Sequence, residues 1–132
     1  MSAIPDRRGF SKKALDYYIE RKHWGVLPDA DHVSELTGSC GDSMTVYLKI
    51  ENNFISDVKF VVMGCIGTIT AAMAIGDLVK GRSIDRALSI NDGDVFKELE
   101  EIPAQKHHCI QLAVKTINQA LKSYQSKSTI VS

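Results

Sequence analysis

The chain has 132 residues, 44% hydrophobic and 24% charged, which favours one compact domain with its own core over a disordered chain. Its 16 basic residues balance 16 acidic ones, which argues against a protein held electrostatically on nucleic acid or an anionic membrane. The most apolar stretch, residues 60–75, is shorter than the roughly 20 residues of a membrane-spanning helix. We therefore predict a single domain over residues 1–132, with flexible ends at 1–9 and 125–132.

The amino-terminal third predicts one short helix followed by a loop. Ser11 is a suitable N-cap, and apolar side chains recur at helical spacing behind it until about Lys22. From residue 23 to residue 42, glycine and proline interrupt the periodicity, which indicates a loop with one brief strand around residues 33–36.

The central third predicts an antiparallel hairpin. Apolar and polar residues alternate over residues 44–51 and again over residues 54–62, which is the period of a strand with one buried face. Asn52 and Asn53 lie between these two runs. Because asparagine tolerates the left-handed backbone of a tight turn, this pair is expected to connect the two strands.

Helical periodicity replaces alternation in the remainder of the chain. Helices are expected from beyond Gly64 to a C-cap at Gly81, over residues 83–88, over residues 94–100, and over residues 108–124. The last is long and amphipathic. The predicted fold class is α+β: a small antiparallel sheet of about three strands, helices packed on one of its faces, and a long C-terminal helix.

Three cysteines are the candidate chemical groups. Cys40, Cys65 and Cys109 each fall at the boundary of a predicted element, where side chains from distant segments can converge. The amino terminus lacks the apolar run of a secretory signal, so we expect a cytoplasmic protein, in which thiols more often bind metal than form disulfides. With Asp42 or His108 as an added donor, the cysteines make a four-coordinate set for zinc or for one iron-sulfur cluster.

The spacing alone leaves simpler interpretations open. A lone cysteine is often a small buried hydrophobe, Asp42 could be a turn residue, and His108 could be a surface residue. No two cysteines are separated by two residues, so the pattern of a zinc finger or ferredoxin is absent. The glycines that flank Cys40 and Cys65 could let the backbone approach a bound inorganic core, or could simply form turns.

Three short motifs occur in order along the chain: Cys40-Gly41-Asp42, Met63-Gly64-Cys65 and His108-Cys109. Together they resemble the signature of the IscU/NifU-type scaffold family, whose domain is like the NifU N-terminal domain, and the likeness covers nearly the whole chain. The resemblance implies a scaffold rather than an enzyme. Such a protein accepts sulfur from a cysteine desulfurase, binds iron, builds a transient iron-sulfur cluster, expected to be 2Fe-2S, and transfers it to apo-proteins.

The same resemblance implies roles for individual residues. The metal ligands would be Cys40, Cys65, Cys109, Asp42 and His108, with zinc as an occupant of the cluster-free protein. Cys109 and Cys40 are the candidate persulfide acceptors, and the helix start beside His108 is expected to lower the thiol pKa of Cys109. Asp42, a harder and weaker ligand than a thiolate, would leave the cluster labile enough to transfer.

Accessory residues and partners follow from the same comparison. Lys106 would neutralise thiolate charge. In many bacterial members of the family, a dedicated Hsp70-type chaperone recognises the segment that corresponds to residues 102–106. This chain shares only Pro103 and Lys106 with it, so that partner is not expected. Residues 66–68 also differ from the run of small residues that is common in the family. His23 and His107 match no family position and are expected to be solvated. Whether cluster binding needs a homodimer is left open.

Two rival functions are retained. The first is a structural zinc-binding domain or a zinc-dependent sulfur-transfer protein built on the same ligands. The second is a thiol enzyme in which His108 and Asp42 activate Cys109. Neighbouring helical residues point about 100° apart, so His108 is expected to be poorly placed as a base for Cys109.

Overall fold

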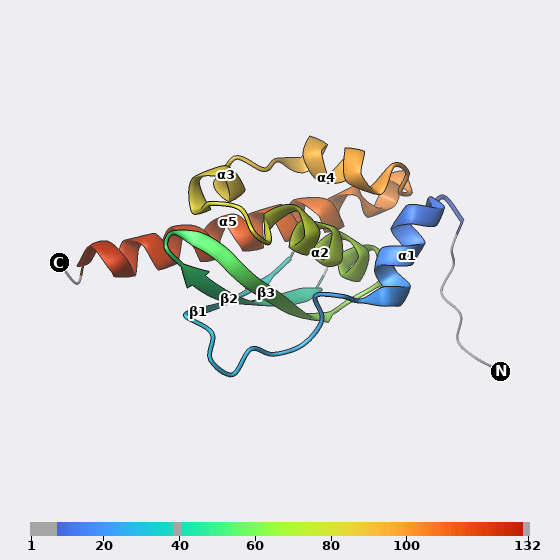
Figure 1. Ribbon diagram of the computed structural model, residues 1–132. Helices are drawn as coiled ribbons and strands as arrows, with labels where there is room; N and C mark the ends of the chain where they lie inside the picture. The colour runs from blue at the N-terminus through green and yellow to red at the C-terminus, as the bar shows by residue number, and fades with distance from the viewer. Residues whose placement is uncertain (1–7, 39–40, 131–132) are drawn as a thin grey trace.

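The computed structural model describes residues 8–38 and 41–130, and it confirms the predicted α+β class (Figure 1). The elements, in chain order, are α1 (Lys12–Glu20), β1 (His32–Thr37), β2 (Ser43–Glu51), β3 (Phe54–Met63), α2 (Ile66–Val79), α3 (Ile84–Leu88), α4 (Asp92–Leu99), the 3-10 turn η1 (Ala104–Lys106) and α5 (His107–Ile130). No helix in the described part of the chain is long and apolar enough to cross a bilayer.

The three strands form one antiparallel sheet in the order β1-β2-β3. Asn52 and Asn53 connect β2 to β3 with positive φ angles of 53° and 69°, which confirms the predicted hairpin turn. The brief strand expected around residues 33–36 is β1, and its Leu36 lies opposite Met44 of β2.

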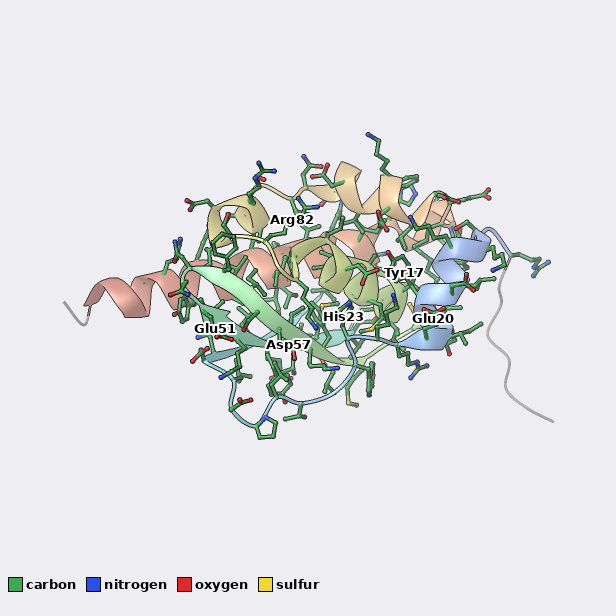
Figure 2. All side chains as sticks on the ribbon, in the orientation of Figure 1. Tyr17, Glu20, His23, Glu51, Asp57 and Arg82 are labelled. Carbon is green, nitrogen blue, oxygen red and sulfur yellow. The ribbon has the colours of Figure 1, made fainter. Side chains whose placement is uncertain are left out.

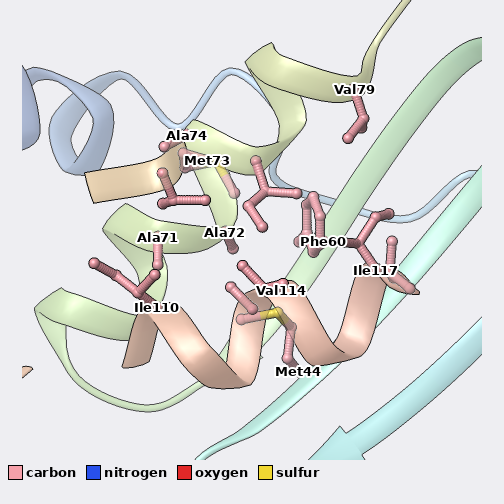
Figure 3. Close-up of a cluster of buried hydrophobic side chains, with 14 of the residues drawn as sticks. Met44, Phe60, Ala71, Ala72, Met73, Ala74, Val79, Ile110, Val114 and Ile117 are labelled. Atoms are coloured by element: carbon pink, nitrogen blue, oxygen red, sulfur yellow. The ribbon is translucent and has the colours of Figure 1, made fainter. Parts of the chain in front are cut away.

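Helices cover one face of the sheet in two layers, as Figure 1 shows. Helices α2 and α5 pack directly on the strands, and α3 and α4 pack on α2 and α5. The core lies between the sheet and the first layer, where Met44 and Phe60 from the strands meet Val114 and Ile117 of α5 (Figure 3). The apolar side chains that recur every two residues in the strands and every 3.6 residues in the helices thus form the two sides of one core.

Helix α2 is buried on nearly every side rather than on a single stripe. Its neighbours are α1, α3, α4, α5 and β3, so small side chains such as Ala71 and Ala74 are buried together with Met73 (Figure 3). A central helix of this kind places its amino end, where Cys65 lies, against several other elements at once.

Three helix ends differ from the prediction by a few residues. Helix α1 ends at Glu20 because Arg21 takes the left-handed conformation and its N–H bonds the carbonyl of Tyr17. Helix α4 begins at Asp92 because Asn91 is the N-cap, and Asp94 completes a capping box. Helix α5 extends to Ile130, past the start of the predicted flexible end, since neither glycine nor proline interrupts residues 125–130.

His23 is buried, which contradicts the prediction that it is solvated. Only 6% of the residue is exposed, and its Nε2 lies 2.8 Å from Oδ1 of Asp77 on α2. Tyr17 of α1 donates a hydrogen bond of 2.5 Å to Glu98 on α4, and Figure 2 labels both Tyr17 and His23 beside α2. The burial follows from packing of the chain after α1 against Gly76, a contact the sequence pattern does not reveal.

His107 is half-buried and also differs from its predicted solvated state. Its ring packs edge-on against Phe96 of α4, with the two ring centroids 4.7 Å apart. The predictions for residues 1–7 and 131–132 lie outside the described residues.

Candidate metal centre

Three ligand atoms from distant parts of the chain lie within 4.8 Å of one another: one carboxylate oxygen of Asp42, Sγ of Cys65 and Sγ of Cys109. Asp42 stands in the turn between β1 and β2, Cys65 is the N-cap of α2, and Cys109 lies in the first turn of α5. The two sulfur atoms are 3.8 Å apart. The structure therefore brings together three of the five predicted ligands. Cys40 lies outside the described residues, and its role stays a prediction.

Two glycines make this convergence sterically possible. A Cβ on Gly64 would lie 2.7 Å from both Cγ and Oδ2 of Asp42. A Cβ on Gly67 would lie 3.1 Å from Sγ of Cys109 and 3.2 Å from the side chain of Lys106. Gly64 and Gly67 are thus close to side chains of the site, whereas Gly41, with a φ of +92°, is a turn glycine. Approach of the backbone to a bound inorganic core stays a prediction.

Asp42 is held at the amino end of α2 by two donors. Its Oδ2 accepts a hydrogen bond of 2.5 Å from the hydroxyl of Thr68 and a longer one of 3.5 Å from the backbone N–H of Cys65. Burial tends to raise the pKa of Asp42, but these hydrogen bonds outweigh it, and the pKa lies below its usual value. The carboxylate is therefore charged and able to bind a cation at neutral pH.

Thr68 is the residue of this site that the sequence reasoning missed. It has no exposed surface and lies three residues after Cys65, on the first turn of α2. The one feature of the sequence that marks Thr68 is that it lies in residues 66–68, which differ from the run of small residues common in the family. That departure did not indicate a contact with Asp42, because the two residues are 26 positions apart.

The two thiols of the site titrate differently. The hydrogen bond between the sulfurs lowers the pKa of the Cys65 thiol. Burial opposes this shift, and hydrogen bonds from Thr68 and Gly67 add to it. The same contact raises the pKa of the Cys109 thiol, and burial raises it further. The prediction of a lowered pKa at Cys109 is therefore wrong, because the contact with the Cys65 sulfur and the loss of solvent outweigh the helix start.

His108 and Lys106 flank this pair of sulfurs. Nε2 of His108 lies 3.6 Å from Sγ of Cys109, so the expectation that the two side chains diverge is wrong: the imidazole is long enough to return to the sulfur. His108 is itself exposed, and a cavity of about 250 Å³ opens beside it between the end of β1 and α5. The charge of Lys106 favours the thiolate of Cys109, and its accessory role stays a prediction.

The donor set fits a tetrahedral metal. Tetrahedral zinc with bonds of about 2.3 Å to sulfur places two ligand sulfurs about 3.8 Å apart, which matches the Cys65 to Cys109 separation. Thiolates select zinc and iron-sulfur centres, and a carboxylate adds one harder ligand. Asp42, Cys65 and Cys109 are thus a suitable donor set for one ion, with ligand atoms that now lie within 4.8 Å of one another moving closer together.

The fold and the site define a class: a small α+β domain in which two cysteines and one carboxylate, a possible set of metal ligands, meet at the amino ends of two helices. Within that class the chain belongs to the family described as NifU-like N terminal domain, whose model matches residues 9–131. The resemblance seen in the sequence is confirmed.

Two named relatives cover most of the chain. It is 36% identical to the "Iron-sulfur cluster assembly scaffold protein IscU" of Aquifex aeolicus, over 89% of this chain and 77% of that protein. It is 40% identical to the "Iron-sulfur cluster assembly protein IscU" of Plasmodium falciparum, over 91% of this chain and 76% of that protein. Both relatives are named for iron-sulfur cluster assembly.

Among solved structures, a NifU-like protein (N-terminal) from Brucella abortus shares the fold with a TM-score of 0.72. The match covers 89% of this chain and 94% of that chain at 20% sequence identity. At that identity the comparison supports the architecture alone.

Proposed function

We propose that this chain is a scaffold on which an iron-sulfur cluster is assembled and from which it is passed to apo-proteins. The observation that carries the proposal is the convergence of Asp42, Cys65 and Cys109 within 4.8 Å. Homology to scaffold proteins named IscU supports the same role. Free thiols are needed to bind iron, which suits a reducing compartment such as the cytoplasm.

The cluster is cargo, and this chain contributes its ligands and its sulfur acceptor. A thiolate of the scaffold attacks the outer sulfur of a persulfide on a cysteine desulfurase. The sulfur-sulfur bond of the donor breaks, and the desulfurase cysteine leaves as a thiolate. Conversion of the transferred sulfur to sulfide takes two electrons, which we assign to an external thiol or a reduced iron-sulfur protein.

The exposure of the thiols bears on which of them receives sulfur. The sequence names Cys109 and Cys40 as candidates, but Cys109 has no exposed surface, whereas Cys65 is partly exposed. We therefore add Cys65 to the candidates. Its sulfur lies 3.8 Å from that of Cys109, close enough for sulfur to pass between them after a small movement.

Asp42 gives the proposed centre its lability. An oxygen ligand binds the iron of a cluster more weakly than a thiolate does, so a centre held in part by Asp42 releases its cargo more readily than an all-cysteine centre. Replacement of Asp42 by alanine is expected to change the rate of cluster release more than the rate of cluster formation.

A zinc-binding domain is the second candidate, favoured by the sulfur separation that suits tetrahedral zinc. A thiol enzyme is not supported in the same way, despite the contact between His108 and Cys109. A nucleophile must be accessible and readily ionised, whereas Cys109 is fully buried and its thiol pKa is raised.

An anaerobic assembly assay separates the scaffold from the zinc domain. The protein is mixed with a cysteine desulfurase, cysteine and ferrous iron, and its visible absorption is followed, and then an apo-ferredoxin is added. A scaffold develops a cluster spectrum and loses it as the ferredoxin gains one. Cys65→Ser and Cys109→Ser should each reduce the yield strongly. A wild-type protein that never gains sulfur or colour would favour the zinc domain.

A further inference from the structure

The hydroxyl of Thr68 links two residues of the metal centre. It donates to Oδ2 of Asp42 at 2.5 Å, and its oxygen lies 3.5 Å from Sγ of Cys65. The residue has no exposed surface, so water does not replace either contact. A threonine hydroxyl has a single hydrogen, and the shorter contact with Asp42 takes it, which leaves the oxygen lone pairs facing the thiol of Cys65.

The carboxylate of Asp42 has few other restraints. Apart from Thr68, the described residues give it the 3.5 Å contact from the N–H of Cys65, which is at the outer limit for a hydrogen bond, and an interaction with the side chain of Cys65. Gly64 leaves open the space that the carboxylate occupies. The orientation of Asp42 therefore depends mainly on the one short, buried contact with Thr68.

We infer that Thr68 is a positioning residue for Asp42. By engaging Oδ2 at the amino end of α2, it keeps a carboxylate oxygen of Asp42 within 4.8 Å of the two sulfurs, where it can bind a metal. Residues that orient a ligand in this way typically change metal affinity 10- to 100-fold when they are removed. The inference rests on the metal centre of the proposed function, but it concerns how this chain's residues bind a metal ion and does not depend on cluster transfer.

Thr70 provides a matched control on the same helix. It is also fully buried, and its hydroxyl has no hydrogen-bond partner in the described part of the chain. A change from threonine to valine keeps shape and volume while it removes the hydroxyl, so Thr68→Val and Thr70→Val make the same chemical change at a site that contacts Asp42 and at one that does not.

The test measures the zinc affinity of the reduced protein by competition with a chromophoric chelator. Thr68→Val should weaken zinc binding by about 10-fold or more, Thr68→Ser should restore affinity to within a few-fold, and Thr70→Val should leave it unchanged. In the Asp42→Ala background, Thr68→Val should have no further effect, because the group that it positions is gone. Thermal unfolding of each variant verifies that the protein is folded.

Unchanged or tighter zinc binding in Thr68→Val would overturn the inference. An equal loss with and without Asp42 would also overturn it, because Thr68 would then act on the fold or on Cys65 alone. The outcome is separate from that of the assembly assay. If zinc affinity shows the coupling between Thr68 and Asp42 while the wild-type protein builds no cluster, the positioning role stands and the scaffold function fails.

Discussion

Gly67 and Gly76 lie on the same helix, α2, and each leaves room for a different neighbour. A Cβ on Gly67 would contact Sγ of Cys109 and the side chain of Lys106 closely, whereas a Cβ on Gly76 would overlap the ring of the buried His23. Gly67 therefore leaves space for the side chains of the proposed metal centre, and Gly76 leaves space for the segment after α1 to pack on α2. Their similar chemistry makes them a matched pair for experiment.

Gly67→Ala is expected to lower zinc affinity with only a small loss of stability. Alanine favours the helix by up to about 1 kcal/mol relative to glycine, which offsets part of the cost of the contact at 3.1 Å with Cys109. Gly76→Ala is expected to lower the free energy of unfolding by about 1–3 kcal/mol through overpacking, with zinc affinity retained. Chemical denaturation and zinc competition on both variants measure these effects. The reverse pattern would contradict the assigned roles.

For single residues, the sequence predicted which residues form the site better than it predicted their pKa values and side-chain orientations. Asp42, Cys65 and Cys109 were named as ligands from a motif, and the structure brings these three together. The lowered pKa of Cys109 and its divergence from His108 were wrong, because both depend on burial and on the reach of side chains across elements. Thr68 was missed for the same reason, since only the fold places it against Asp42.

Among the elements, α1 is attached to the helical layers by a small set of polar contacts. Tyr17 reaches Glu98 on α4, Lys13 forms an ion pair with the same carboxylate, and His23, just beyond α1, bonds Asp77 on α2. Burial tends to raise the pKa of Asp77, but hydrogen bonding by His23 and Tyr17 outweighs it, so the pKa lies below the usual 3.8.

This shift predicts how Asp77→Asn changes stability with pH. Because the folded-state pKa of Asp77 is below that of the unfolded chain, its contribution is fully present above about pH 4 and is lost as the pH falls through the folded-state value. The wild-type protein should therefore be more stable than Asp77→Asn at pH 7, and the difference should shrink below pH 4. Urea denaturation at several pH values measures it. A difference that is constant with pH would contradict a charged Asp77.

The hairpin turn gives a second test at this scale. Asn53 has a φ of 69°, so Asn53→Val should lower the free energy of unfolding by about 1–2 kcal/mol, since a β-branched residue is strained in the left-handed region. Asn53→Gly should stay within about 1 kcal/mol of the wild-type protein. Thermal or chemical denaturation distinguishes them, and equal stability of the two variants would contradict the observed turn.

The elements themselves were largely readable from the sequence. Alternation predicted β2 and β3, the asparagine pair predicted their turn, and Ser11 and Ser83 predicted the starts of α1 and α3, where both hydroxyls accept backbone N–H groups. Helix ends were less accurate, because a left-handed Arg21 or an N-cap at Asn91 depends on one local conformation. The burial of α2 on all sides depends on tertiary packing, which periodicity does not report.

For the whole molecule, topology explains why residues so far apart in sequence share one site. The turn before β2, the corner after β3 and the start of α5 all lie at the same end of the sheet, because Ser43 pairs with Met63 in the register of β2 and β3 and the amino-terminal part of α5 packs beside α2. Each ligand therefore sits at the boundary of an element. The core fixes those boundaries, so the site is built from the same packing that stabilises the fold.

The central claim is that Asp42, Cys65 and Cys109 bind one metal centre, and the coordination shell of the zinc-loaded protein tests it most directly. X-ray absorption at the zinc edge should show at least two sulfur ligands at about 2.3 Å and at least one oxygen or nitrogen ligand at about 2.0–2.2 Å. Cys65→Ser and Cys109→Ser should each remove one sulfur from that shell. A shell without sulfur, or one that neither substitution changes, would contradict the claim.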